Sequence, residues 1–490
     1  MNVTDGFAED FSGDFSKGSV PAAILRQAFP LIGAQIVNVL YNIVDRIFIG
    51  RIPIVGRDAL TGLGVCFPII TLITAFANLA GNGGAPRAAI ARGAGDTEAA
   101  GRFMGNALSL LLIFSVACVA VFFAAKRSLL GAFGASGVTL PYADEYMSVY
   151  LFGTPAMMIS LGMNPFINMQ GYAKIGMLTV AIGAVVNLIL DPLFIFVFGM
   201  GVRGAALASV IAQYVSALWA ILFLTGKRAP IRVRWASLRP RGYIIRKILS
   251  LGFSNFTMSV TESAVQTVCN TTLSLFGGDL YVGVMTVVNS VRQIIMLPMS
   301  GFAQGASPVV GFNYGAKRYG RVREAVRFQF FICVGYALAA WLICMALPGA
   351  LIRVFNRDAE LIAAGIPSLR IYFSMFFAMS MQMTGQFSFV AMGKAKQATF
   401  FSFLRKGAIV IPLALILPRL WNLGVRGVFI AEPISDIIGS TACFTTFMLT
   451  QWRRLGDAPA AAGSRDTIRT TACGAEHRVN GIHTDGKGER

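Results

Sequence analysis

The segment FMGNALSLLLIFSVACVAVFFAA, residues 103–125, contains no charged side chain. A helix needs about 20 mostly apolar residues to cross the hydrocarbon core of a bilayer, so this segment predicts a transmembrane helix. Comparable segments recur along the whole chain. They predict about twelve spans, near residues 22–50, 59–85, 103–125, 147–171, 177–199, 204–225, 248–277, 282–310, 325–348, 367–392, 398–418 and 427–450.

The composition agrees with a lipid environment. Of the 490 residues, 55% are hydrophobic and 13% are charged, whereas an ordinary soluble domain is about 45–50% apolar and 25% charged. The net charge of +19 would suggest a nucleic-acid partner in a soluble protein. Here most Lys and Arg residues lie in short segments between spans, where they act as topology signals, so no nucleic-acid partner is expected.

The loops differ in charge in a way that predicts orientation. One set of alternate loops carries 19 Lys and Arg residues, and the opposite set carries nine. Cytoplasmic loops are enriched in these residues, so the first set is predicted to be cytoplasmic. An even number of spans then places both termini in the cytoplasm, and we expect a multi-pass protein of the plasma (inner) membrane.

Short motifs recur at offsets of 222 or 223 residues and indicate two repeated halves. Gly83-Gly84-Ala85-Pro86 corresponds to Gly305-Ala306-Ser307-Pro308, with the two prolines 222 residues apart. Gly171 and Gly393 are separated by the same offset, and Gly-Val-Arg-Gly occurs at 201–204 and at 424–427. A six-helix unit begins and ends on one side of the membrane, so the halves are parallel repeats whose binding site is expected near their interface.

The predicted organisation is therefore an all-α membrane protein of two six-helix lobes around a central cleft. Its parts are a polar N-terminal segment (1–20), an N-lobe (21–225), a basic linker (226–247), a C-lobe (248–450) and a polar, disordered tail (451–490).

Ionisable residues inside spans are costly, so each one is a functional hypothesis. In the first half, Asn187 and Asp191 are four residues apart and share a helix face. Pro192 follows them and should free backbone carbonyl oxygens. This combination suits a hard cation such as sodium, although an interhelical hydrogen bond could also satisfy Asp191. Asp45 lies in the first span as a second candidate or as a boundary residue, and Tyr41 on the same face could donate to it.

The acids of the second half leave two interpretations open. Glu262 could exchange a proton, or it could pair with Arg292 in a structural role. Glu432 and Asp436 are four residues apart on the twelfth span, where two carboxylates repel unless a proton or cation intervenes. Ion coupling and interhelical packing are both compatible with this pair. Candidate cleft residues are Tyr41, Gln266, Met285, Gln382 and Gln386.

Two absences narrow the chemistry. The only histidines, His477 and His483, lie in the polar tail, and no P-loop motif occurs. We therefore expect no enzymatic activity, no cofactor beyond the coupling ion and no requirement for an ATPase subunit.

The chain resembles the multidrug and toxic compound extrusion (MATE) family over roughly residues 20–452, most closely its MepA-type bacterial branch. The motifs that carry the resemblance are Tyr41-Asn42-Ile43-Val44-Asp45, Asn187 through Pro192, Gly204-Ala205-Ala206-Leu207-Ala208-Ser209, Gly301-Phe302-Ala303-Gln304-Gly305 and Gly311-Phe312-Asn313-Tyr314-Gly315-Ala316.

The resemblance implies antiport driven by sodium ions or protons. It assigns Asp45, Asn187 and Asp191 to an N-lobe cation site, with Ser209 in place of a threonine. Some relatives use an acid matching Glu262 together with a tenth-helix Asp, but the tenth span here offers only Gln382 and Gln386. The expected cargo is lipophilic organic cations, moved by a monomer in contact with membrane lipids.

Two other functions remain as alternatives. A flippase of lipid-linked precursors shares the broad fold, and Arg292, Arg405 and Lys406 could hold its pyrophosphate. A membrane-embedded enzyme would require a clustered catalytic constellation, which the spread of the acids over two lobes disfavours.

Overall fold

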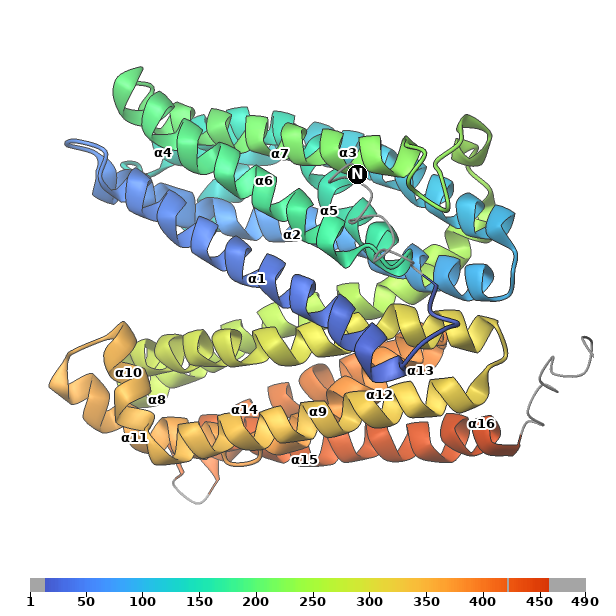
Figure 1. Cartoon of the computed structure of the whole chain (residues 1–490). Helices are drawn as coiled ribbons and strands as arrows, with labels where there is room; N and C mark the ends of the chain where they lie inside the picture. The colour runs from blue at the N-terminus through green and yellow to red at the C-terminus, as the bar shows by residue number, and fades with distance from the viewer. Residues whose placement is uncertain (1–13, 421–422, 458–490) are drawn as a thin grey trace, which may run out of the picture.

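The structure, a computed structural model, describes residues 14–420 and 423–457 and contains only helices and connecting segments in that part of the chain (Figure 1). The first half forms α1 (Val20–Gly50), α2 (Gly56–Gly93), α3 (Thr97–Ala132), α4 (Leu140–Tyr150), α5 (Thr154–Met169), α6 (Ala173–Pro192) and α7 (Gly201–Thr225). The second half forms α8 (Gly242–Gly315), α9 (Tyr319–Ala346), α10 (Pro348–Phe355), α11 (Ala359–Phe373), α12 (Met379–Ala391), α13 (Ala395–Phe403), α14 (Ile411–Ile416), α15 (Val425–Phe447) and α16 (Arg453–Asp457).

Ten helical stretches among the described residues are long and apolar enough to cross a membrane. One of them, α8, has 74 residues and contains Gly278 at φ 64°, which divides it into two crossing lengths. The predicted fourth span is formed by α4, a short 3₁₀ turn and α5, a continuous helical run outside those ten. Counting α8 twice and adding this run gives the twelve predicted spans, so the predicted all-helical membrane fold is confirmed.

The two halves form separate lobes (Figure 1). One apolar core is built from α1–α7 and the start of α8, and a second from the rest of α8 through α15. A third cluster joins them, because Val20 and Ile24 at the start of α1 pack with residues of α8, α9 and α12. The motif pairs found in the sequence adopt matching backbones: Gly171 and Gly393 both have positive φ, at 94° and 68°.

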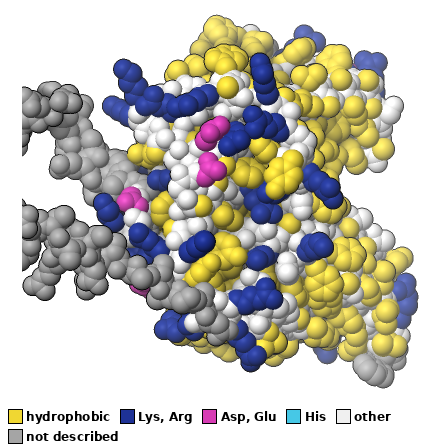
Figure 2. All heavy atoms as spheres, turned by 90° about the vertical axis from the view of Figure 1, so that its right-hand side faces the viewer, with side chains coloured by type: hydrophobic (Ala, Val, Ile, Leu, Met, Phe, Trp, Pro, Cys, Tyr) yellow, Lys and Arg dark blue, Asp and Glu magenta, His cyan; other side chains and the backbone are white. Residues whose placement is uncertain are grey.

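The lobes meet through α2 and α8 at the end of the molecule that carries most of the basic loops, called the basic end below. Figure 2 shows Lys and Arg side chains spread over this face. At this end, a side chain on Gly93 would fall on the carbonyl oxygen of Phe312, and one on Gly315 would fall on that of Ile90. The contacts are reciprocal between the repeats, and glycine allows the two backbones to touch.

We expect Gly315→Leu to hold the basic ends of the two lobes apart, because no side chain fits against the Ile90 carbonyl. Spin labels at Glu98 and Glu324, two exposed positions on opposite lobes, should show a longer mean separation by double electron–electron resonance. Gly320→Leu is the control, since Gly320 is exposed and a Cβ atom added there meets no atom within 4 Å. An unchanged distance in the Gly315 variant would contradict this packing.

The residues before α1 cross the same junction. Phe15 is 4% exposed and packs against Phe312 with ring centroids 5.9 Å apart. Arg318 and Arg321 of the C-lobe donate to backbone carbonyls of residues 15–18, including the carbonyl of Ser16 at 2.8 Å. The segment therefore fastens the start of α1 to the C-lobe.

Several boundaries differ from the prediction. The helices are longer than the minimal spans; α2, for example, covers Gly56–Gly93 where 59–85 was predicted. Helix α10 lies in a predicted loop. The predicted tail begins at residue 451, but helix continues to Asp457; residues 458–490, including both histidines, and residues 1–13 lie outside the described part.

Candidate functional site

The N-lobe site is assembled by α1, α6 and α7. Asn187 and Asp191 lie one turn apart on α6, which ends at Pro192 and continues as a π-helical turn over Leu193–Val197. Pro192 has no N–H, so it cannot donate to the carbonyl of the preceding turn. Local π-helix often accompanies functional sites, because the widened turn leaves backbone oxygens less engaged.

The predicted polar side chains converge at this point. The Asn187 amide donates to Asp191 Oδ1 at 3.1 Å and to Ser209 Oγ at 3.3 Å. Asp45 and Asp191 are close enough for their carboxyl groups to interact, and Tyr41 lies close to Ser209. Helix α1 therefore meets α6 and α7, which lie far from it in sequence, at one small polar site.

This site has more acceptors than donors. Asp45 is 7% exposed, Asn187 1% and Asp191 0%. One side-chain oxygen on each receives no hydrogen bond from any described residue: Asp45 Oδ1, Asn187 Oδ1 and Asp191 Oδ2. Buried polar atoms without partners are costly. Such a set of hard oxygens around two carboxylates can hold a small cation or a shared proton.

The C-lobe acids have a different environment, because each faces a base. Arg405 and Lys406 lie in a π-helical segment (Leu404–Val410) and face Glu432 and Asp436 of α15. Lys406 Nζ lies 2.6 Å from Glu432 Oε1, and Arg405 Nη1 lies 2.8 Å from Asp436 Oδ1 and 3.3 Å from Glu432 Oε1. Arg405 thus offsets the repulsion between the two carboxylates, and all four side chains are at most 6% exposed.

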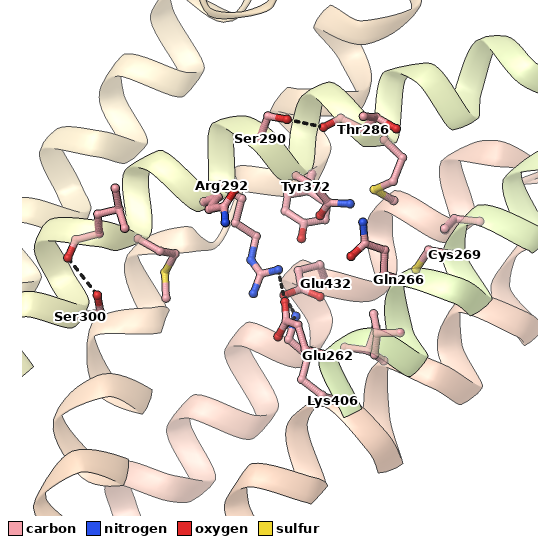
Figure 3. A pocket seen from close by; sticks show the side chains of 18 residues that line it. Glu262, Gln266, Cys269, Thr286, Ser290, Arg292, Ser300, Tyr372, Lys406 and Glu432 are labelled. Atoms are coloured by element: carbon pink, nitrogen blue, oxygen red, sulfur yellow. Dashed lines mark hydrogen bonds and ion pairs between the residues drawn. The ribbon is translucent and has the colours of Figure 1, made fainter. Parts of the chain in front are cut away.

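Glu262 and Arg292 form a further ion pair, joining the two halves of α8. The Glu262 side chain is 38% exposed, and its other oxygen lies 3.8 Å from Lys406 Nζ. This pair lines a cavity of about 470 Å³ together with Gln266, Met285 and Tyr372 (Figure 3). The volume lies within the range of small-molecule sites.

The remaining predicted cleft residues lie elsewhere. Gln386 is 4% exposed, and its amide donates to Ser254, Ser402 and the Ala398 carbonyl at 2.7–3.0 Å. It ties α12 to α8 and α13 and does not line the C-lobe cavity. Gln382 is 5% exposed and also does not line that cavity.

The pairing of Glu432 with Lys406 and Asp436 with Arg405 was missed in the sequence. One signal was available: more than four residues from either end of a span, the C-lobe spans contain three bases, Arg292, Arg405 and Lys406, against three acids. Intramembrane charges usually pair, so equal numbers favoured a neutral network over free carboxylates.

Comparison with known proteins decides the family. The MatE profile matches residues 30–193 and 256–416, about two thirds of the chain. The chain belongs to the MatE family. Members are transporters and not enzymes, and the matched segments fall one in each lobe.

Curated relatives of this MatE chain include the multidrug export protein MepA of Staphylococcus saprophyticus, 24% identical over 86% of this chain and 92% of the relative. MepA of Staphylococcus aureus strain MSSA476 is 23% identical over 89% of this chain and 94% of the relative. Among solved structures, an outward-facing multidrug resistance MATE transporter matches with a TM-score of 0.83 and 25% identity, covering 91% of this chain and 99% of that one. The MepA-type assignment made from the sequence is thus confirmed.

Proposed function

We propose that this MatE transporter exports organic cations in exchange for sodium ions or protons, with the N-lobe site as the coupling site. The observation that best supports this proposal is a set of three buried oxygens, on Asp45, Asn187 and Asp191, that receive no hydrogen bond from described residues. The site needs no cofactor, because a monovalent cation or a proton supplies the missing positive charge. Multidrug export is the activity named for the MepA relatives.

The proposed cycle is alternating access of a monomer in the inner membrane, with both termini and the basic end in the cytoplasm. In that orientation the structure is closed toward the cytoplasm, where Gly93 and Gly315 allow α2 and α8 to touch. Entry of the ion neutralises the carboxylates of Asp45 on α1 and Asp191 on α6. To drive transport, the bound ion must stabilise one conformation of the transporter more than the other. Because α1 also packs on the C-lobe through Val20 and Ile24, a shift of α1 would change its contacts with both lobes.

The precursor-flippase alternative is weakened by the C-lobe charges. Arg292, Arg405 and Lys406 each contact a carboxylate, so they offer no uncompensated positive pocket for a pyrophosphate. The same pairing means that the charged residues lining the C-lobe cavity, Glu262, Arg292, Lys406 and Glu432, carry no net formal charge. Glu262 is the most exposed of the four.

Expression in a drug-sensitive bacterial strain should raise the inhibitory concentration of ethidium and similar lipophilic cations several-fold over the empty vector. The Asp45→Asn/Asp191→Asn variant, at equal membrane abundance, should not. A flippase or a membrane enzyme would leave the inhibitory concentrations at the vector level, and that outcome would contradict the proposal.

A further inference from the structure

A groove lies at the basic end between the beginning of α8, which packs on the N-lobe core, and the beginning of α13 in the C-lobe. Its volume is about 770 Å³, and it is separate from the C-lobe cavity. Its walls are mostly apolar and come from Ile245, Leu249 and Phe253 on α8 and from Ala395 and Phe400 on α13. Phe253 is 52% exposed and Phe400 is 58% exposed. In a membrane protein, such a surface is covered by lipid.

Charge is confined to one end of this groove. Arg246 lies one turn into α8, and Lys396 is the second residue of α13. Both line the groove and are exposed. Neither forms an ion pair with any carboxylate among the described residues. Two positive charges therefore remain uncompensated by the described part of the chain, at the end of the groove where its apolar walls begin.

Along each helix the basic side chain comes first and the apolar side chain follows, which matches the charged head and apolar tail of a lipid. Arg246, Ser250 and Phe253 follow one another at helical spacing on one face of α8, as do Lys396 and Phe400 on α13. At 1.5 Å per residue, Arg246 and Phe253 are separated by roughly 10 Å along the axis. Hydroxyl groups of Ser250 and Thr399 also line the groove, next to the cations, where they can donate to a phosphate.

We propose that this groove binds one anionic phospholipid, with its phosphate between Arg246 and Lys396 and an acyl chain along Phe253 and Phe400. The charge complementarity selects the lipid class: two cations without partners favour an anionic headgroup over a zwitterionic one. Basic pockets between transmembrane helices at the cytoplasmic surface are known to hold such headgroups. The groove lies outside the ion and cargo sites, so this binding is independent of the transport proposal.

The test is native mass spectrometry of the full-length protein released from nanodiscs of dioleoylphosphatidylglycerol or dioleoylphosphatidylcholine. The wild-type protein should retain one phosphatidylglycerol more tightly than phosphatidylcholine. Arg246→Gln/Lys396→Gln should weaken that retention roughly 30-fold, as expected for two cations near the membrane surface. Phe253→Ser/Phe400→Ser should weaken retention of both lipids.

The matched control is Arg228→Gln/Arg234→Gln, which removes the same charge from the neighbouring linker, outside the groove. It should leave phosphatidylglycerol retention unchanged. Equal loss in the control would assign the effect to general surface charge and overturn the proposal. Competition by inorganic phosphate as effective as that by the lipid, or dimerisation that depends on Phe253 and Phe400, would also overturn it.

Discussion

Asp191→Asn should reduce ion-driven ethidium export from proteoliposomes by roughly 5–150-fold, the range expected when a typical coupling free energy is lost. Asp191 is fully buried, and its Oδ2 receives no hydrogen bond from described residues. The amide substitute keeps an acceptor for the Asn187 N–H but removes the negative charge. The fold should therefore survive while the response to the ion is lost.

Asp279→Asn provides the control for this substitution. Asp279 is an exposed carboxylate just after the kink at Gly278 of α8, far in sequence from α1, α6 and α7, which form the N-lobe site. The Asp279→Asn variant should export ethidium at the wild-type rate. If the Asp191→Asn variant exports ethidium at the wild-type rate, Asp191 is not part of the coupling site.

Glu432→Gln should destabilise the protein by up to about 3–5 kcal/mol, the cost of leaving a buried charge without its partner, because Lys406 then keeps only the more distant Glu262. Lys406 is 1% exposed, and after the change its nearest carboxylate oxygen is that of Glu262 at 3.8 Å. The measurement is the thermal unfolding midpoint in detergent, followed by size-exclusion chromatography.

A second variant separates the charge effect from a packing effect. Glu432→Gln/Lys406→Met removes the buried cation together with its partner, so most of the lost stability should return. If the single variant is as stable as the wild type, or if the double variant is no better than the single one, the ion pair does not have the structural role described here.

The sequence predicts the spans and the repeat well because both depend on local information. A bilayer sets the length of each apolar segment, and the glycine motifs recur at nearly the same offset, 222 or 223 residues. The relation between Asn187 and Asp191 also follows from spacing, since they share one helix face. Their convergence with Asp45 and Ser209 came only from the family resemblance, because these residues lie on other helices.

Contacts between helices were harder to predict. Glu262 and Arg292 are on separate halves of α8, and Lys406 meets Glu432 across two helices. Hydropathy does not give the rotation of one helix against another, so the pairing remained open. Gln386 shows the same difficulty: a polar residue in a span was predicted to face the cleft, but it bonds to Ser254 and Ser402 inside the C-lobe.

The two lobes thus share a scaffold but differ in their charges. In the N-lobe, two carboxylates lie close to each other, and no described base forms a hydrogen bond or ion pair with either of them. In the C-lobe, three carboxylates face three bases. This asymmetry is the physical reason for assigning coupling to the N-lobe.

The most direct test of that assignment is ethidium efflux from proteoliposomes under an imposed sodium gradient and, separately, an imposed proton gradient. The wild-type protein should respond to at least one gradient, Asp45→Asn should lose that response, and Glu262→Gln should keep the same ratio of driven to undriven efflux. A gradient response that persists in Asp45→Asn but disappears in Glu262→Gln would place coupling in the C-lobe and contradict the account.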